Sequence, residues 1–354
     1  MDSAFQYNVI RRGGFVAELP RAPRQLAVTY SFAGKHHTLD DLLKRSRTQG
    51  FLVIKGGKII DERYFNGADD KSKFTSWSVG KSFTSTLVGL ALADGKIKGL
   101  DDPITNYVPE LKGSGYDNVP IKDILEMSSG VKFTEEYSNG ESDVSIMWRK
   151  TMIEQSESFA DYAKSVDRAE IPGTKWVYRS VDTGVLGMLV KSVTGKLLAN
   201  MLSERIWQPL GMESDAMWLT DKAGLEAAYC CINATLRDYA RFGLLFLHHG
   251  KAGDQQLLPA SWVEAATSPH GPQVQWGRLI PGDSAGYGYQ WWLMEPSTPH
   301  TYSAEGVFFQ FVYVSPKYDM VIVKTSAYDD FWSVPMQNEQ FLAFDAIGAA
   351  LEKH

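Results

Sequence analysis

The chain has 354 residues, of which 44% are hydrophobic and 22% are charged, and its formal net charge is −6. These proportions are ordinary for globular proteins and argue against a disordered or fibrous chain. A net negative charge without a run of basic residues gives no electrostatic reason to bind nucleic acid or an anionic membrane. We therefore expect a folded protein that acts on small uncharged or cationic molecules, with no nucleic-acid or membrane partner.

Two local features bear on the compartment in which the chain works. The first fifteen residues, MDSAFQYNVIRRGGF, lack the apolar segment and cleavage site of a signal peptide. No apolar run approaches the roughly 20 residues of a membrane span, so a cytoplasmic protein is expected. Cys230 and Cys231 are neighbours, and because adjacent residues rarely satisfy disulfide geometry, we expect both to be reduced.

The predicted elements begin with a β-hairpin. Residues 51–65, FLVIKGGKIIDERYF, are rich in β-branched and aromatic side chains around Gly56-Gly57, which is typical of two strands joined by a tight turn. From Ser78 onward apolar residues recur at helical spacing until Gly95, a typical residue after the end of a helix. This pattern predicts a long and mostly buried helix.

The rest of the chain divides into a helical and a strand-rich part. Residues from about 100 to 250 hold short helical patterns separated by Pro and Gly, which indicates a mostly helical insertion. Strand patterns return in YGYQWWLM, GVFFQFVYVSP and DMVIVKTSA, and the tail from Met336 is amphipathic and helical. We predict one α+β domain over residues 1–354, with an antiparallel sheet built from about residues 20–95 and 250–354 and a helical subdomain over about residues 96–249.

Ser78 and Lys81 lie three residues apart at the start of the predicted helix. Residues at this spacing share one face of a helix, so the lysine amine can reach the serine hydroxyl. The positive end of the helix dipole favours an alkoxide and disfavours an ammonium ion, and burial lowers the pKa of a lysine further. The pair therefore predicts a nucleophilic serine that a neutral lysine activates.

Other nucleophile patterns are weaker. Ser129 and Lys132 have the same spacing, but Gly130 lies between them in a turn-like stretch, so nothing fixes their side chains on one face. GDSAG at residues 282–286 matches the nucleophile elbow Gly-x-Ser-x-Gly, which requires a following helix, whereas a strand pattern follows here. Its histidine would have to be His300 or His354. The histidines show no metal-binding spacing, and we expect neither a metal nor a cofactor.

The segment SVGKS, followed by PGTKWVYRSVDTGVLGMLVKSVTGK at residues 172–196, resembles the penicillin-recognising serine hydrolases of the class C β-lactamase branch. Their second motif is Tyr-x-Asn, and Tyr178-Arg179-Ser180 stands in that place without the asparagine. The wording YRSVDTGVLG is closer to the 6-aminohexanoate-dimer (nylon oligomer) hydrolases and to β-lactamase-fold esterases. The resemblance implies a β-lactamase/transpeptidase-like fold, in which helices flank an antiparallel sheet and the active site lies in the cleft beside a helical subdomain.

The resemblance also implies the roles of several residues. Ser78 would form an acyl-enzyme, Lys81 would act as the general base, and Tyr178 would relay the proton to the leaving group. Two stretches compete for the third family motif, Ala304-Glu305-Gly306 and Lys324-Thr325-Ser326. We favour the first because glycine lets a substrate approach the backbone closely.

The N–H groups of Ser78 and Val307 would by the same analogy form the oxyanion hole. A β-lactamase holds the carboxylate of its substrate with a cation or hydroxyl of the third motif, which Ala304 and Glu305 do not supply. A charged Glu305 would repel that carboxylate, so we expect slow β-lactam hydrolysis. Aromatic residues near the motifs, among them Trp77 and Phe308, suit an apolar acyl chain or an alkyl ester.

Residues 133–148, FTEEYSNGESDVSIMW, resemble the loop that covers the cleft in this family. The resemblance implies that Tyr137 closes on an amide substrate and that Asp143 meets its amino end, while Ser180 also borders the substrate.

The sequence thus predicts a serine hydrolase that cleaves an ester or a linear amide, and it does not choose between these two substrate classes. A D-aminopeptidase, a peptidoglycan peptidase and a weak β-lactamase are alternatives within the same chemistry. A catalytically silent ligand-binding domain is an alternative of another class, because the asparagine is missing and the third motif is altered. No pattern indicates an oligomeric state.

Overall fold

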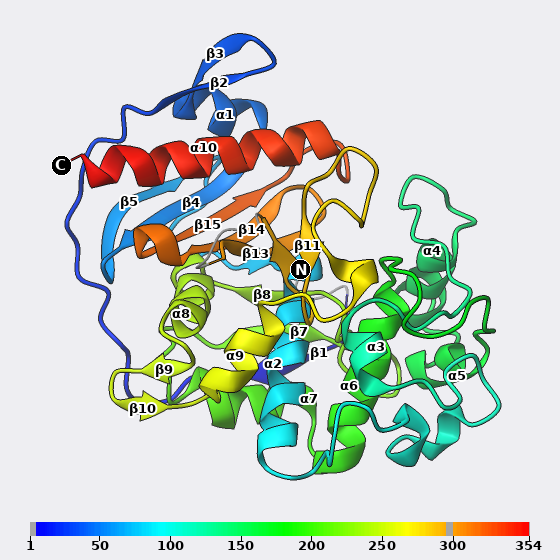
Figure 1. Ribbon diagram of the computed structural model, residues 1–354. Helices are drawn as coiled ribbons and strands as arrows, with labels where there is room; N and C mark the ends of the chain where they lie inside the picture. The colour runs from blue at the N-terminus through cyan, green and yellow to red at the C-terminus, as the bar shows by residue number, and fades with distance from the viewer. Residues whose placement is uncertain (1–4, 295–299, 354) are drawn as a thin grey trace.

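The computed structural model describes residues 5–294 and 300–353, and a seven-stranded antiparallel sheet forms its centre (Figure 1). In order across the sheet, the strands are β11 (Gly286–Tyr287), β12 (Trp292–Leu293), β13 (Tyr302–Gly306), β14 (Gln310–Ser315), β15 (Met320–Ser326), β4 (Thr48–Lys55) and β5 (Lys58–Tyr64). The predicted hairpin of β4 and β5 is confirmed. Because β4 pairs with β15, both ends of the chain build one sheet, as the predicted α+β class requires.

Both faces of this sheet are covered by helices. On β4, Leu52 and Ile54 belong to one hydrophobic core, whereas Phe51 and Val53 belong to the other, because successive side chains of a strand point to opposite faces. Helix α10 (Val334–Glu352) covers the second core, and α8 (Leu236–Leu247) packs on the first (Figure 1). Strands that are covered on both faces carry continuous apolar runs, and this explains the apolar sequences of the predicted strands.

Helix α2 (Gly80–Ala93) connects the sheet to the helical region, because it contacts both α6 (Ser180–Thr194) and α7 (Leu198–Leu202). Its buried stretch runs from Gly80 to Ala91. Phe83 stacks on Phe242 of α8, with 3.7 Å between the ring centroids. After the helix, Gly95 adopts a left-handed φ of 68°, so the predicted helix and its glycine end are both confirmed.

The remaining elements surround this frame. The other helices are α1 (Leu39–Arg45), α3 (Ile121–Leu125), α4 (Asp143–Trp148), α5 (Phe159–Lys164) and α9 (Ala260–Ala266). The other strands are β1 (Tyr7–Ile10), β2 (Thr29–Phe32), β3 (Lys35–Thr38), β6 (Phe74–Thr75), β7 (Ala216–Leu219), β8 (Ile232–Ala234), β9 (Lys251–Ala252) and β10 (Gln255–Gln256). A second antiparallel sheet has the order β1-β7-β8-β6. The division into subdomains stays a prediction, although α8, in the segment predicted as helical, packs on the large sheet.

The prediction of two reduced cysteines is wrong. Cys230 and Cys231 form a disulfide between adjacent residues. Cys231 has a left-handed φ of 72°, a conformation that residues other than glycine rarely adopt. The expectation that adjacent cysteines do not pair assumes an ordinary backbone conformation. Cys231 does not have one.

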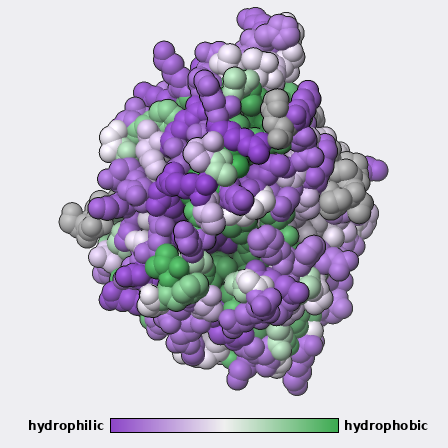
Figure 2. Space-filling model, turned by 90° about the vertical axis from the view of Figure 1, so that its left-hand side faces the viewer, coloured by the Kyte–Doolittle hydropathy of each residue, from purple (hydrophilic) through white to green (hydrophobic). Residues whose placement is uncertain are grey.

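Most of the surface seen in Figure 2 is hydrophilic, with apolar residues in scattered patches. Among the described residues, no single helix combines the length and the apolar composition of a membrane span. Within residues 5–294 and 300–353, the one helix pair that meets those criteria together is α6 with residues 198–207, which are bent by 75°.

The packing of α2 against α8 can be tested by replacing Phe83, which is completely buried. We expect Phe83→Ala to lower the free energy of unfolding by about 3–5 kcal/mol, because the lost ring leaves a cavity. Urea denaturation followed by circular dichroism measures the change. Phe15→Ala is the control, since Phe15 is 65% exposed and its loss should cost about 0.5 kcal/mol or less. Equal losses in the two variants would contradict the packing described here.

Candidate active site

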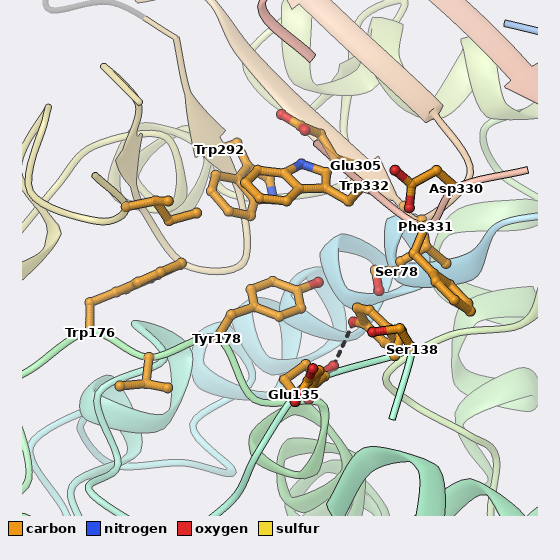
Figure 3. A pocket seen from close by; sticks show the side chains of 16 residues that line it. Ser78, Glu135, Ser138, Trp176, Tyr178, Trp292, Glu305, Asp330, Phe331 and Trp332 are labelled. Atoms are coloured by element: carbon orange, nitrogen blue, oxygen red, sulfur yellow. Dashed lines mark hydrogen bonds between the residues drawn. The ribbon is translucent and has the colours of Figure 1, made fainter. Parts of the chain in front are cut away.

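Ser78 lies in a short 3-10 turn, Trp77–Val79, immediately before α2. Trp77 has a left-handed φ of 43°, which is strained for a residue with a side chain. Its ring packs against Phe308, with 5.2 Å between the centroids, and this contact helps to hold the bend. The bend places the Ser78 side chain in a cleft, at the positive end of the helix (Figure 3).

The Lys81 side chain reaches Ser78 from the first turn of α2. Its Nζ lies 2.9 Å from Ser78 Oγ, 3.1 Å from Ser180 Oγ and 3.0 Å from the carbonyl oxygen of Tyr229. Burial lowers the pKa of Lys81 to about 8, although the negative charge of Glu135 opposes the shift. About one lysine in ten is therefore neutral at pH 7 and able to accept the serine proton.

Tyr178 lies beside this pair. The Lys81 Nζ is 4.8 Å from the centre of the Tyr178 ring, and the phenol oxygen points toward Ser78 (Figure 3). Burial raises the pKa of Tyr178 well above its ordinary value, and a hydrogen bond with Ser78 opposes that rise. A phenol that stays protonated at neutral pH can relay a proton between two groups, but it cannot act as the general base in the resting enzyme.

Glu135 is a site residue that the sequence analysis missed. Its Oε2 accepts a hydrogen bond of 2.8 Å from the backbone N–H of Ser180, the first residue of α6. Its Oε1 accepts hydrogen bonds from the hydroxyls of Ser180 at 2.5 Å and Tyr137 at 2.6 Å. The available signal was an acidic pair, Glu135-Glu136, next to Tyr137, but nothing in the sequence links this loop to Ser180.

The structure brings residues 305–307, and not Lys324, to the serine. A Cβ atom on Gly306 would lie 2.7 Å from Ser76 O and 3.0 Å from Ser78 N, so β13 approaches the turn too closely for any residue except glycine. Lys324 is completely buried on β15, where its Nζ donates to Ser326 Oγ at 2.6 Å. It lines neither of the cavities that meet at Ser78.

Glu305 borders the cleft, whereas Ala304 is buried and does not line it. The Oε2 atom of Glu305 accepts a hydrogen bond of 2.6 Å from Gln337 in α10. Its Oε1 is buried and has no hydrogen-bond partner in the described part of the chain. Burial, with the charge of Asp283, raises the pKa of Glu305 well above its ordinary value. Because only the ionised carboxylate repels an anion, the predicted repulsion applies only above the raised pKa of Glu305.

Two cavities meet at Ser78. The larger, of about 470 Å³, is lined by six aromatic residues, namely Tyr137, Trp176, Tyr178, Trp292, Phe331 and Trp332, and by the carboxyl side chains of Glu135, Glu136, Glu305 and Asp330, among others. The smaller, of about 240 Å³, lies toward Trp77, Met147, Trp148 and Phe308. Ser78, Tyr137, Val307 and Phe331 line both cavities. Two cavities with aromatic walls therefore open from the serine.

Comparison with known proteins agrees with this geometry. A family model described as Beta-lactamase matches residues 37–339, which include every residue of the cleft discussed so far. The chain belongs to the β-lactamase family. A 6-aminohexanoate-dimer hydrolase of Paenarthrobacter ureafaciens is 29% identical over 299 residues, which are 82% of this chain and 76% of the relative.

Solved structures of other proteins share the fold of this β-lactamase-family chain. A Bacillus anthracis protein with a provisional assignment as a 6-aminohexanoate-dimer hydrolase superposes with a TM-score of 0.89 at 26% identity, over 99% of this chain and 92% of that chain. A family VIII carboxylesterase has a TM-score of 0.64 at 15% identity, over 84% of this chain and 92% of that chain. The predicted family and fold are confirmed, and the relatives are hydrolases.

The cleft-covering loop of this β-lactamase-family chain differs in part from the prediction. Tyr137 lines both cavities and stacks on Phe331, with 5.5 Å between the centroids. Asp143 lines neither, and its carboxylate accepts hydrogen bonds of 2.8 Å from the backbone N–H and the hydroxyl of Thr134. Asp143 therefore holds the loop together, whereas Glu135 of the same loop lines the larger cavity together with Ser78. Ser180, predicted to border the substrate, lines the smaller cavity and also links Lys81 to Glu135.

The weaker nucleophile patterns do not form a site. Ser129 is buried and donates to Asp182 at 2.7 Å, whereas Lys132 is exposed. Ser284 of GDSAG lies in a loop before β11, so a strand follows it and not a helix. His300 packs on Trp276, and His354 lies outside the described residues.

No group of three or more His, Cys, Asp or Glu side chains that could hold a metal ion occurs within residues 5–294 and 300–353.

Lys324→Met tests the choice between the two third-motif stretches. Burial lowers the pKa of Lys324 to about 7. Between about pH 7 and 10 the unfolded chain therefore binds more protons than the folded one, so the wild type gains stability as pH rises. We expect the variant to keep hydrolase activity and to be more stable by about 1 kcal/mol or more at pH 7, with an advantage that shrinks toward pH 10. Thermal unfolding and ester hydrolysis measure both effects. A large loss of activity with intact folding would restore Lys324 as a motif residue.

Proposed function

We propose that the protein is a serine hydrolase that cleaves an ester or a linear amide through an acyl-enzyme on Ser78. The observation that carries this proposal is the buried Lys81 amine, 2.9 Å from the Ser78 hydroxyl, beside a cleft of about 470 Å³. A serine paired with a desolvated amine is an activated nucleophile, because the amine can be neutral near physiological pH.

In the proposed reaction, Ser78 Oγ attacks the carbonyl carbon of the substrate while neutral Lys81 takes the hydroxyl proton. The N–H groups of Ser78 and Val307 would stabilise the oxyanion, and the close approach of Gly306 to Ser78 supports this pairing. The proton then passes from Lys81 through Tyr178 to the oxygen or nitrogen of the leaving group, whose bond to carbon breaks. Water attacks the acyl-enzyme, gives its proton to the same relay and restores Ser78.

The two cavities support a substrate with an apolar portion on each side of the scissile bond. A linear amide fits this shape, and the match to a 6-aminohexanoate-dimer hydrolase favours that class. An alkyl ester fits equally well. The third-motif position offers Glu305 where a β-lactam carboxylate would need a cation, so β-lactams are expected to be poor substrates.

The nucleophile and base can be tested with a fluorophosphonate probe. We expect one adduct per chain, on Ser78, formed at a rate that rises with pH through about 8, because the pKa of Lys81 is about 8 and only the neutral amine accepts a proton. Lys81→Ala should slow labelling at pH 7 by about 10²–10⁴-fold. Mass spectrometry measures both rates.

Lys132→Ala is the matched control, because Lys132 also follows a serine by three residues but is exposed, and it should label at the wild-type rate. A folded wild type without an adduct would favour the ligand-binding alternative. Labelling of Lys81→Ala at the wild-type rate would exclude this lysine as the base.

Substrate choice can be tested with alkyl esters, 6-aminohexanoate dimer and nitrocefin. We expect esters or the linear amide to exceed nitrocefin in kcat/KM by about 10- to 100-fold, since the lost charge-assisted contact at the third motif costs about 1.5–3 kcal/mol. Raising the pH should disfavour nitrocefin further, because Glu305, whose pKa is raised, then becomes negatively charged. Glu305→Thr should narrow the gap. Nitrocefin turnover equal to that of the best ester would contradict this assignment.

A further inference from the structure

We propose that Glu135 is a positioning residue for the general base: it fixes the hydroxyl hydrogen of Ser180 and thereby leaves the lone pair of Lys81 facing Ser78 alone. The inference rests on the proposed function, in which Lys81 takes the proton of Ser78.

The first step concerns the single hydroxyl hydrogen of Ser180. Its Oγ lies 2.5 Å from Oε1 of Glu135, and its backbone N–H donates to Oε2 of the same carboxylate. An ionised carboxylate only accepts hydrogen bonds, so the Ser180 hydroxyl must be the donor. With that hydrogen committed, Ser180 Oγ can only accept a hydrogen bond from Lys81, which lies 3.1 Å away.

The second step concerns the neutral amine of Lys81, which has two N–H donors and one lone pair. One N–H is directed to Ser180, and the other is directed to the carbonyl oxygen of Tyr229 at 3.0 Å, which also only accepts. The lone pair is left for the third neighbour, the Ser78 hydroxyl at 2.9 Å. This is the orientation that a general base requires, and it follows from two neighbours that cannot donate to Lys81.

The carboxylate of Glu135 is part of the protein's own network and not an open subsite. It accepts three hydrogen bonds, from the backbone and hydroxyl of Ser180 and from the phenol of Tyr137. The groups that face Lys81 are Ser78 on the 3-10 turn, Tyr178 in the loop before α6, Ser180 at the start of α6, the Tyr229 carbonyl before β8, and the more distant Glu135. Of these, Glu135 is the charged group, and its charge raises the pKa of Lys81 against the effect of burial.

Glu135→Gln separates these effects from simple packing, because it keeps the shape of the side chain. The backbone N–H of Ser180 still needs an acceptor, so the amide oxygen takes that position and the amide NH₂ faces the Ser180 hydroxyl. Ser180 then accepts from the amide and gives its own hydrogen to the Lys81 lone pair. The base would point toward Ser180 and away from Ser78.

The experiment measures kcat and kcat/KM as functions of pH for an aryl ester. It compares the wild type, E135Q, S180A and the double variant. We expect E135Q to lower the plateau of kcat by about tenfold or more with little change in KM, as part of the general-base contribution is lost. Its acidic limb should move to lower pH, because removing the carboxylate destabilises the Lys81 ammonium. In the S180A background, E135Q should cost less than about twofold in the plateau, since no hydroxyl remains to be turned.

The matched control is E136Q, which removes the same charge from the neighbouring and exposed Glu136. Its acidic limb should stay at the wild-type pH. Rates are normalised to the number of serines that fluorophosphonate labels, so partial unfolding does not imitate the effect. If E135Q does not fold, S180A alone should lower the plateau while its limb moves little, because the charge of Glu135 remains.

An E135Q profile equal to that of E136Q, or additive losses in the double variant, would overturn the inference while leaving the proposed function intact. Absence of labelling at Ser78 in the wild type would instead overturn the proposed function, and this inference with it.

Discussion

The burial of a lysine amine against a serine hydroxyl is the constraint on which the rest of this structure depends. Lys81 is 2% exposed, and its three close polar neighbours are two hydroxyls and a carbonyl, none of which carries a charge. A carboxylate in direct contact would hold the ammonium form and make the lysine useless as a base. Glu135 stands one hydroxyl further away, where it moderates the effect of burial and leaves the pKa of Lys81 at about 8.

Maintaining this geometry requires rigid supports on several sides. Phe83 and Phe242 lock α2 onto α8, while contacts of α2 with α6 bring Ser180 to the amine. On the opposite side β13 approaches the turn that carries Ser78 so closely that only Gly306 fits. The left-handed Trp77 between these supports is strained, and a strained residue persists only where its surroundings determine its conformation. The site is therefore a product of packing among elements that lie far apart in the sequence.

The success of the sequence predictions depended on how local each feature is. The hairpin of β4 and β5, helix α2 and the spacing of Ser78 and Lys81 are decided within a few residues, and the structure has each of them as predicted. The role expected for Asp143 failed because loop geometry turned its carboxylate toward Thr134, and the cysteine prediction failed because a rare backbone bend allowed neighbouring thiols to pair. Motif similarity located the loop at residues 133–148, but it could not show that Glu135 and not Asp143 lines the cavity.

By itself, the sequence determined the α+β class and the spacing of Ser78 and Lys81, because periodicity and short spacing fix these within single elements, and its motifs identified the family. Only the tertiary structure decided that Glu135 meets Ser180, 45 residues away, that Glu305 is buried beside Gln337 of the last helix, and that Lys324 lies in the sheet apart from the serine. Those facts depend on which long-range contacts the fold makes and on how much water it excludes from each carboxylate or amine. Burial sets the pKa of such groups, and burial is a property of the packed molecule, not of any segment of the chain.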